Sequence, residues 1–568
     1  MTPDLPLPAA ADLTARPPRP AATLVLLRDG ADGVQVLLLQ RAERGDHNSG
    51  AWVFPGGLVD KADALLHGLV DGLTPAQAAD QLKLAEGALD YAIAAMRECF
   101  EECGLLFGVD AETAASLEPW RGPIHRGEKT LLDLHRETGV RLDLREVAYL
   151  SHWLTPLGRA KRFDTRFFIA AAPHGQVARH DGTEMTAHRW MRIPDALAEG
   201  DALKLMGPTR ATLMSLAHFK TVAEVMAWAR SPREVPRIFP RIGEGAQGQR
   251  PVMPDEHAWA ELGRLDPQGL GTAWYDIVAD RAVRLSPRII RVTAGNASVM
   301  TGPGTNSYLV GGGPRNEWSV IDPGPVDEAH VQALVAAAPG PITRILVTHT
   351  HSDHSPACVA LKAATGAITL GRIADFADRQ DKTFVPDQPL QGDERIVIDD
   401  GTTLRVIHTP GHASNHLCYL LEEENTLFTG DHVMQSSTVV INPPDGDMAA
   451  YVASLRSLAQ MDGIDWLAPG HGFLMEQPRR AFEWIVRHRL QREAKVLEAL
   501  QAGGPADADQ LLAQVYDDVT PRLHAIAMRS LLAHLYKLRG EGRAVEENGR
   551  WRVIATGPQE AAVSRASA

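Results

Sequence analysis

Short apolar runs that alternate with helical patterns organise most of this chain. Near the N-terminus, ATLVLLRD (22–29) and VQVLLLQRA (34–42) predict two strands, and AWVFPGGLVD (51–60) predicts a strand that runs into a glycine-rich turn. From Thr74 to about Phe107 the apolar spacing is helical, and Thr74 with Pro75 behind it is a typical helix start. A first α/β region is completed by strand-like RFDTRFFIAAAPHG (162–175) and helical GPTRATLMSLAHFKTVAEVMAWARS (207–231).

A second region follows a segment rich in Pro, Gly, Arg and Gln, which predicts a linker over residues 231–280. As far as His471, short apolar strands alternate with helices, a pattern typical of a layered α/β domain. After Arg479 the pattern changes to a long helix that ends at Gly503-Gly504, and two more helical stretches follow. Two short strands then flank Asn548-Gly549, a strong hairpin turn. Three helices and a hairpin predict a winged-helix unit.

Composition and charge limit the class of protein. The 568 residues allow about three to four domains, and a hydrophobic content of 44% suffices for large cores. A net charge of −14 argues against general nucleic-acid binding, although not against a local basic groove. Four cysteines make no disulfide framework, and no apolar run is long enough for a membrane helix, so we expect no membrane partner. Because the Pro- and Ala-rich start lacks signal-peptide features, we expect a cytoplasmic protein.

Candidate metal ligands follow four predicted strands. THTHSDH (348–354) comes directly after the apolar run Ile345-Leu346-Val347, and later strands end in HTPGH, FTGD and APGHG. Imidazole nitrogens and carboxylate oxygens are the ligands that zinc takes, and the ends of strands form the functional edge of an α/β sheet. We therefore predict a metal centre built from His349, His351, Asp353, His354, His412, Asp431 and His471.

These motifs, in this order, resemble the metallo-β-lactamase superfamily, whose fold is an αβ/βα sandwich with a binuclear site. By that resemblance, one zinc ion is held by His349, His351 and His412, the second is held by Asp353, His354 and His471, and Asp431 bridges the two. Two such ions lower the pKa of a shared water toward neutrality. Asp353 is the best candidate to orient that water or to accept its proton. His416, in GHASNHLCYLL, is a candidate for contact with the substrate or for support of a ligand.

Two longer stretches are similar to the lactamase-like endoribonucleases: NASVMTGPGTNSYLVG, and GHASNHLCYLLEEENTLFTGDHVM followed by HRLQRE and a winged helix. This resemblance implies cleavage of phosphodiesters in single-stranded RNA. Between Ala481 and Ile554, however, 11 Lys/Arg stand against 10 Asp/Glu, whereas binding to a phosphate backbone needs local positive charge. A basic cluster on one helix offers either phosphate contacts or a solvated face: Arg487, Arg489, Arg492 and Lys495. A thioester or lactone, which the same two-zinc chemistry can cut, is the alternative substrate.

An acidic helical turn marks the first region. Glu98, Glu101 and Glu102, in RECFEECGL, lie at i, i+3 and i+4 and share one helical face, where a hard cation such as Mg²⁺ would offset their repulsion. With FPGG upstream, RE-x-x-EE-x-G resembles the second half of a Nudix box, which makes Gly57 a candidate for substrate contact. The box has a glutamate where this chain has Asp63, and an insertion of about two dozen residues separates that position from Arg97.

One Nudix subgroup carries such an insertion: the hydrolases similar to the peroxisomal coenzyme A diphosphatases. This chain also resembles that subgroup in four further stretches, VFPGGLVD, WLTP, RFDTRFF and GPTRATL. The resemblance implies hydrolysis of a diphosphate, such as that of a coenzyme A derivative, by metal-activated water. Mg²⁺ or Mn²⁺ would be held by the three glutamates, with Glu102 as a candidate base, and Arg97 would pair with an acidic neighbour. A degenerate Nudix domain that only binds ligand is the alternative.

Together these patterns predict a multidomain α/β and α+β metallo-hydrolase. We expect a flexible arm (1–18), a Nudix α/β/α sandwich (19–230), a linker (231–280), a metallo-β-lactamase αβ/βα sandwich (281–478), a small winged-helix domain (479–556) and a flexible tail (557–568). A ligand-sensing or scaffold protein with one inactive site is the alternative from a different class.

Overall fold

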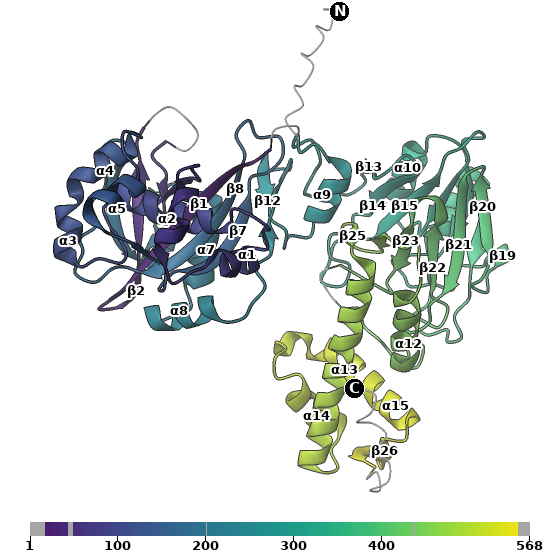
Figure 1. Cartoon of the computed structure of the whole chain (residues 1–568). Coiled ribbons are helices and arrows are strands. Elements are labelled where there is room, and N and C mark those ends of the chain that lie inside the picture. Colours follow the sequence, from purple (N-terminus) through teal and green to yellow (C-terminus); the bar gives the residue numbers. More distant parts are fainter. Residues whose placement is uncertain (1–16, 44–48, 200–201, 436–437, 555–568) are drawn as a thin grey trace, which may run out of the picture. The chain divides into compact units, whose positions relative to one another are not determined.

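The computed structural model describes residues 17–43, 49–199, 202–435 and 438–554. The predicted tail, and all but the last two residues of the predicted arm, lie outside the described residues. The chain folds as two compact units, residues 1–242 with 268–270 and residues 243–267 with 271–568 (Figure 1). In the part of the chain that the structure describes, no helix is both long and apolar enough to cross a membrane.

The first unit is built around a mixed sheet of eight strands in the order β10-β7-β8-β1-β2-β3, with β4 on β1 and β9 on β2. The long strand β1 pairs in parallel with β8, where Val25 lies opposite Ile169, and antiparallel with β2, where Leu27 lies opposite Val36. The strands are β1 (Arg19–Gly30), β2 (Gly33–Arg41), β3 (Trp52–Val53), β4 (Gly56–Leu58), β7 (Ala148–Leu154), β8 (Phe163–Ala171), β9 (Met185–Arg192) and β10 (Arg237–Ile238).

The helical pattern predicted from Thr74 to Phe107 forms two helices. In α1 (Pro75–Leu82), Thr74 and Gln77 form a capping box, so the predicted start is confirmed. Lys83 then adopts a left-handed conformation, which ends this helix before α2 (Ala88–Cys103) begins. The helix α2 packs on β1 through a core that includes Leu24 and Leu26. Figure 1 shows α2 with other helices of the unit: α3 (Ala111–Ser116), α4 (Glu118–His125), α5 (Leu131–Thr138), α7 (Gly207–Leu216) and α8 (Val222–Arg230). The unit also contains α6 (Ile193–Ala198) and the pair β5 (Val70–Asp71) and β6 (Leu142–Asp143).

The second unit contains two sheets that face each other, which confirms the predicted αβ/βα sandwich. Apolar side chains from both sheets, among them Tyr308, Leu346, Leu404 and Phe428, form the core between them. One sheet has the order β13 (Ala282–Arg284), β14 (Ile289–Thr293), β15 (Asn306–Gly311), β16 (Trp318–Ile321), β17 (Ile342–Leu346), β18 (Ile368–Gly371) and β19 (Gln388–Pro389). The other has the order β20 (Arg395–Asp399), β21 (Thr402–His408), β22 (Leu417–Leu421), β23 (Thr426–Gly430), β24 (Trp466–Pro469) and β25 (Met475–Glu476).

Helices cover the outer face of each sheet. On the first sheet, α10 (Glu328–Ala337) and α11 (Cys358–Thr365) bury Leu334 and Leu361 against the strands. On the second, α12 (Met448–Ala459) and the start of α13 (Pro478–Gly503) contribute Leu455 and Phe482. Residues 231–280, where we expected a linker, also form β11 (Arg241–Gly243), β12 (Arg250–Val252) and α9 (Trp259–Leu265).

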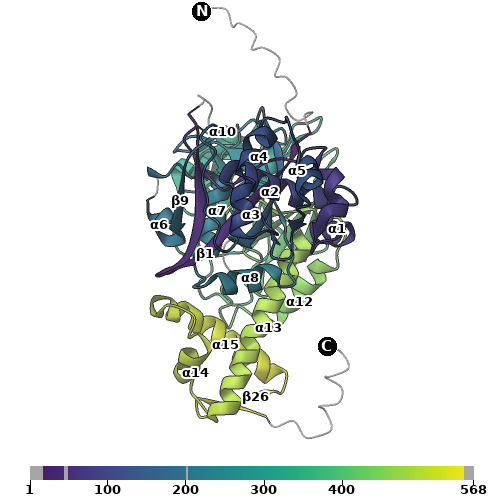
Figure 2. The same ribbon diagram turned by 60° about the vertical axis from the view of Figure 1, so that its left-hand side comes forward.

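The winged-helix unit is present as predicted. The helix α13 runs from the sandwich into this unit, where it packs with α14 (Ala508–Val515) and α15 (His524–Gly540) (Figures 1 and 2). The strands β26 (Ala544–Glu547) and β27 (Arg550–Val553) form the hairpin, and Asn548 and Gly549 at its turn both have positive φ. Leu531, Leu535 and Trp551 lie in its core.

Candidate metal centre

The seven predicted ligands come together at one edge of the sandwich. The segment that carries four of them follows β17, while His412, Asp431 and His471 come soon after β21, β23 and β24. They form two groups, in each of which the ligand atoms lie within 4.8 Å of one another. The first group is His349, His351 and His412, and the second is Asp353, His354, Asp431 and His471.

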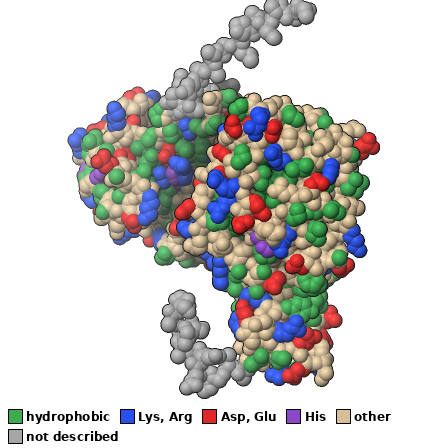
Figure 3. Space-filling model, turned by 90° about the vertical axis from the view of Figure 1, so that its right-hand side faces the viewer, with side chains coloured by type: hydrophobic (Ala, Val, Ile, Leu, Met, Phe, Trp, Pro, Cys, Tyr) green, Lys and Arg blue, Asp and Glu red, His purple; other side chains and the backbone are tan. Residues whose placement is uncertain are grey.

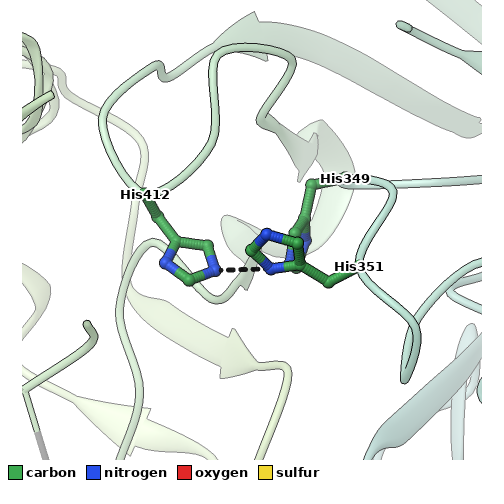
Figure 4. Close-up of side chains that lie close together, drawn as sticks. All are labelled: His349, His351 and His412. Atoms are coloured by element: carbon green, nitrogen blue, oxygen red, sulfur yellow. Dashed lines mark hydrogen bonds between the residues drawn. The ribbon is translucent and has the colours of Figure 1, made fainter. Parts of the chain in front are cut away.

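Figure 4 shows the first group converging from two loops. Nε2 of His412 lies 3.0 Å from Nδ1 of His351, and the rings of His349 and His351 meet edge to face. Asp431 lies between the two groups, because Oδ2 is 3.8 Å from Nε2 of His412 while Oδ1 is 3.2 Å from Nε2 of His471. This is the position that a carboxylate shared by two ions would need.

The atoms that face the centre suit divalent cations. Nε2 of His349 is buried and has no hydrogen-bond partner among the described residues, while Nε2 of His354 and Oδ1 of Asp431 are buried with only ionic contacts inside the cluster. Leaving such polar atoms unpaired in the interior is costly, and neutral imidazole with carboxylate is a donor set that divalent metals take. The residues therefore fit the binding of metal ions.

Hydrogen bonds behind the ligands orient the rings. Nδ1 of His412 bonds the carbonyl of Val440 at 2.8 Å, and Nδ1 of His471 bonds that of Gly304 at 3.1 Å. Nδ1 of His354 is 2.9 Å from the carboxylate of Asp322. A carbonyl or carboxylate at Nδ1 favours the proton there, which leaves Nε2 free to bind a cation.

Charge and burial shift the ring pKa values in opposite directions. Burial and the neighbouring histidines lower the pKa of His351 to about 3. Burial acts in the same direction on His471, but the carboxylates of Asp431 and Asp353 outweigh it and raise the pKa of His471 to about 9. The carboxylates thus attract positive charge to the second group.

Two glycines allow the ligand loops to approach one another. A Cβ at Gly470 would lie 2.7 Å from Oδ1 of Asp431 and 2.9 Å from the ring of His354. Gly411 has φ of +143° and lies directly against the backbone of Tyr451 in α12. A side chain at either position would collide with the centre or its support.

The sequence did not lead us to Asp322, which lies just beyond β16. Its carboxylate accepts from the backbone N–H and the hydroxyl of Thr348, each at 2.7 Å, as well as contacting His354. The signal was available, because Asp322 follows the apolar strand WSVI just as the ligands follow theirs. It supports the ligand loop and lies outside both ligand groups.

His416, which we considered for substrate contact, is fully buried. Nδ1 lies 2.9 Å from the hydroxyl of Thr409, and the ring stacks on His349 at 5.1 Å between centroids. In this position the ring contacts a ligand candidate from behind and does not reach solvent.

In the first unit, Asp63 and Arg97 are in contact although the insertion in the Nudix-like motif separates them along the chain. Arg97 donates to both carboxylate oxygens of Asp63, at 2.9 and 3.2 Å, and also pairs with Glu98 and Glu101. The guanidinium is therefore engaged with acidic neighbours, and Asp63 takes the place of the expected glutamate.

The three glutamates of α2 differ in their surroundings. Glu102 is buried and accepts from the backbone N–H of Gly56 at 2.9 Å, while the carboxylate of Glu98 lies against Gly57. Glu101 instead contacts Arg97 at 3.0 Å and His125 at 3.5 Å. Burial raises the pKa of Glu98 to about 7, and burial together with the charge of Glu98 raises the pKa of Glu102.

A further carboxylate near this turn carries no sequence motif. Glu184, just before β9, interacts electrostatically with Glu98 and Glu102 and forms an ion pair with Arg41 at 3.0 Å. It lies more than 80 positions along the chain from α2, so only folding brings it there.

Comparison with known families agrees with this architecture. Residues 300–471 match the metallo-beta-lactamase superfamily, residues 7–203 match the NUDT19 Nudix domain, and residues 508–551 match the beta-lactamase associated winged helix domain.

Similar proteins include an atrochrysone carboxyl ACP thioesterase from Aspergillus chevalieri, 32% identical over 48% of this chain and 88% of that protein. A beta-lactamase-like protein 2 homolog from Drosophila melanogaster is 30% identical over 46% of this chain and 90% of that protein. Among solved structures, a NUDIX hydrolase from Alicyclobacillus acidocaldarius is 28% identical over 38% of this chain and 97% of that chain, with a TM-score of 0.33.

Proposed function

Because this chain belongs to the metallo-β-lactamase superfamily and carries a Nudix domain ahead of that fold, we propose that its second unit hydrolyses thioesters at a centre of two zinc ions. The ions would be held by the two groups of ligands described above, with Asp431 between them. When bound, they would polarise the thioester carbonyl and lower the pKa of water in the site. Membership of the family is thus the ground for the metal chemistry, and the residues around the site are the ground for a thioester substrate.

The observation that carries the thioester proposal is a set of exposed apolar side chains on two loops beside the ligands. Val299 and Met300 are 83% and 46% exposed, and their loop is tied to Thr305, which pairs with His471. Ile373 and Phe376 are 60% and 44% exposed. Such side chains suit an acyl group better than a phosphodiester backbone.

The second of these loops is anchored at both ends beside the first ligand group. The backbone N–H of Asp375 donates to the hydroxyl of Ser414 at 2.9 Å, two residues from His412. The backbone N–H of Asp381 donates to the carbonyl of Thr350, between His349 and His351. With the thioester carbonyl of the substrate at the metal ligands, its acyl chain would therefore lie along this loop.

In the reaction, Asp353 would orient water and accept its proton. Its side chain is 25% exposed, whereas most of the ligand candidates are buried. Burial opposes its ionisation, but His354 and His471, each 3.4 Å from Oδ2, lower the pKa of Asp353 and keep it a carboxylate. An ionised, partly accessible carboxylate accepts a hydrogen bond from water and so orients it, and it can take the proton because the ions, when bound, would lower the pKa of that water as well.

Single-stranded RNA is the weaker candidate, because the basic cluster of α13 is mostly engaged. Arg489 is buried and donates to the carbonyl of Val439. Arg492 pairs with Asp518 at 2.7 Å and Lys495 pairs with Asp517 at 3.2 Å. On the face drawn in Figure 3, acidic and basic side chains are interspersed, without the basic stripe that a phosphate backbone would need.

For the first unit we propose hydrolysis of a diphosphate linkage in a small molecule, such as a coenzyme A derivative, with Mg²⁺ or Mn²⁺ at Glu98 and Glu102. These two carboxylates face the glycine-rich turn at Gly56 and Gly57. Glu101, which like Glu98 pairs with Arg97, points to His125 instead. Glu102 is then the candidate base, and Gly57 would lie beside the substrate.

One experiment tests both proposals. The purified chain is analysed for metals and assayed on acyl thioesters, coenzyme A derivatives and labelled single-stranded RNA, alongside His351→Ala and Glu102→Ala. We expect His351→Ala to abolish thioester hydrolysis alone and Glu102→Ala to abolish diphosphate hydrolysis alone. Each variant serves as the control for the activity of the unit that it leaves unchanged.

Cleavage of RNA but of no thioester would overturn the thioester proposal. Binding of a coenzyme A derivative without turnover would mean that the Nudix domain only senses ligand.

A further inference from the structure

One exposed face of α13 combines a large aromatic ring with unpaired positive charge. Arg480, Trp484, Arg487, His488 and Gln491 lie at i, i+4, i+7, i+8 and i+11, so they share one side of the helix. The opposite side carries Phe482, Ile485 and Arg489, which are buried. We call the exposed residues Arg480, Trp484 and Arg487, together with the half-buried His488, the Trp484 face.

The ring of Trp484 is set up for stacking. It is 51% exposed, although an indole of this size usually gains from burial. Its plane lies 16° from that of His488, with the centroids 5.4 Å apart, so the histidine holds it in one orientation. A flat ligand on its free side would gain the stacking energy without ordering a mobile side chain.

The charges beside Trp484 favour an anion. Arg480 donates to the side chain of Gln477, and among the described residues Arg487 has no ion-pair partner. The exposed Glu483 comes one position before Trp484, three after Arg480 and four before Arg487, and among the described residues it forms no ion pair with either arginine. The two arginines span about 10 Å of helix, at about 1.5 Å per residue.

The short distance between the two arginines favours a single nucleotide over a nucleic-acid strand as the ligand. A strand needs phosphate contacts repeated along its path, but the next cations on α13, Arg492 and Lys495, are neutralised by Asp518 and Asp517. One aromatic platform with two arginines that have no ion-pair partner among the described residues fits one base and its phosphates.

The helix that carries the Trp484 face is connected to the metal centre through its opposite, buried side. Arg489, little more than one turn beyond Trp484, donates to the carbonyl of Val439, and the next carbonyl, that of Val440, bonds Nδ1 of His412. The helix that carries the platform therefore packs against the residues that hold a ligand. Figures 1 and 2 both show α13 leaving the sandwich beside α12.

We propose that the Trp484 face binds the adenine nucleotide end of a coenzyme A thioester whose acyl group is cleaved at the metal centre. Adenine stacks on Trp484, and the phosphates pair with Arg480 and Arg487. This inference rests on the thioesterase activity proposed above, and it names the carrier of the acyl group.

The test compares one acyl group on two carriers: coenzyme A, and N-acetylcysteamine, which lacks the nucleotide. We expect Trp484→Ala to lower kcat/KM for the coenzyme A thioester about tenfold, mainly through KM, and to leave the truncated thioester unchanged. Trp484→Phe retains part of the preference, and Arg487→Ala adds a loss that grows at low salt. Tyr536→Ala removes a 38% exposed aromatic ring elsewhere in the winged-helix unit and serves as the matched control.

Equal losses on both carriers, or no loss on the coenzyme A thioester, would overturn the inference. So would hydrolysis restricted to thioesters on an acyl carrier protein. If the wild type cleaves no thioester, the proposed function fails, and binding of adenosine 3′,5′-bisphosphate by calorimetry then tests the Trp484 face alone. Weakening of that binding by Trp484→Ala supports the platform, whereas binding of an RNA oligonucleotide in its place overturns it.

Discussion

Single side chains behind the metal cluster decide which nitrogen each histidine presents. Asp322 is the clearest case, since one carboxylate positions both the start of the ligand loop at Thr348 and the ring of His354. It has φ of +51°, a conformation that a side chain seldom adopts without support from its surroundings. Residues of this kind bind no substrate, yet the site depends on them.

We expect Asp322→Ala to lower the affinity for metal by about 10- to 100-fold, because His354 loses the acceptor that fixes its tautomer. Metal content after dialysis and competition with a chelator measure this effect. Asp327→Ala, at the N-cap of α10, is the control: it should cost about 1 kcal/mol of stability and leave metal affinity unchanged. Equal metal affinity in both variants would contradict the role of Asp322.

In the first unit, Glu101 and Glu102 provide a matched pair on one helix. Because Glu102 faces Gly56 and Glu101 faces Arg97, we expect Glu102→Gln to abolish metal-dependent diphosphate hydrolysis. Glu101→Gln should instead lower stability by about 1–3 kcal/mol and reduce activity less, since it leaves Arg97 with one acidic partner fewer. Activity assays and thermal unfolding separate the two effects, and a reversed order would show that Glu101 is the ligand.

Among the elements, α9 has a role beyond joining domains. Its Glu261 forms a buried bidentate pair with Arg291 of β14, at 2.6 and 2.9 Å, and accepts from the backbone N–H of Leu474 at 2.8 Å. Leu474 lies three residues after His471, so a helix that precedes the sandwich helps to hold the last ligand loop.

Breaking this pair should be costly. We expect Glu261→Gln to destabilise the second unit by about 3–5 kcal/mol, because Arg291 stays buried without its counterion. The surface pair Arg250–Glu256 is the control, and Glu256→Gln should cost at most about 1 kcal/mol. Chemical denaturation measures both, and a Glu261 variant as stable as the control would contradict this account.

The winged-helix unit has its own buried carboxylate on α13. Burial alone would raise the pKa of Glu493, but His534 and Lys537, with Arg543 beside them, outweigh it and lower that pKa. A carboxyl with a depressed folded pKa contributes stability above its unfolded pKa and loses it as pH falls through the folded value.

We therefore expect Glu493→Gln to cost about 3 kcal/mol at neutral pH and to flatten the loss of stability on acidification. Denaturation of wild type and variant from neutral pH down to pH 3 measures this difference. Parallel pH profiles for the two proteins would count against the interpretation.

For the whole molecule, we expect the fold to persist without metal, because the sandwich has an apolar core between two sheets. We expect a chelator to abolish thioester hydrolysis while the chain stays folded, with a lower Tm, and zinc to restore activity. Circular dichroism and activity on the same samples test this. Unfolding on metal removal would show that the ligands also stabilise the fold.

Much of the architecture was determined by the sequence alone, since it is local. Apolar runs of strand length, the capping residues at Thr74 and the turn at Asn548-Gly549 each specify their own elements. The ligand motifs were equally visible, because each follows an apolar strand and strand ends share an edge. The prediction that Arg97 pairs with an acidic neighbour is confirmed at Glu98 and Glu101, which lie on the same helix, whereas its contact with Asp63, 34 positions away, depends on the fold.

Only the tertiary structure decided what lies opposite each of these side chains. Helical spacing puts Arg487 and Arg489 on different sides of α13, but only the fold shows that Arg489 donates to Val439 while Arg487 has no ion-pair partner among the described residues. Nor does the sequence place Glu184 beside α2 or Glu261 beside the His471 loop. Charge and exposure depend on partners far apart along the chain, and those partners meet only when the sheets pack.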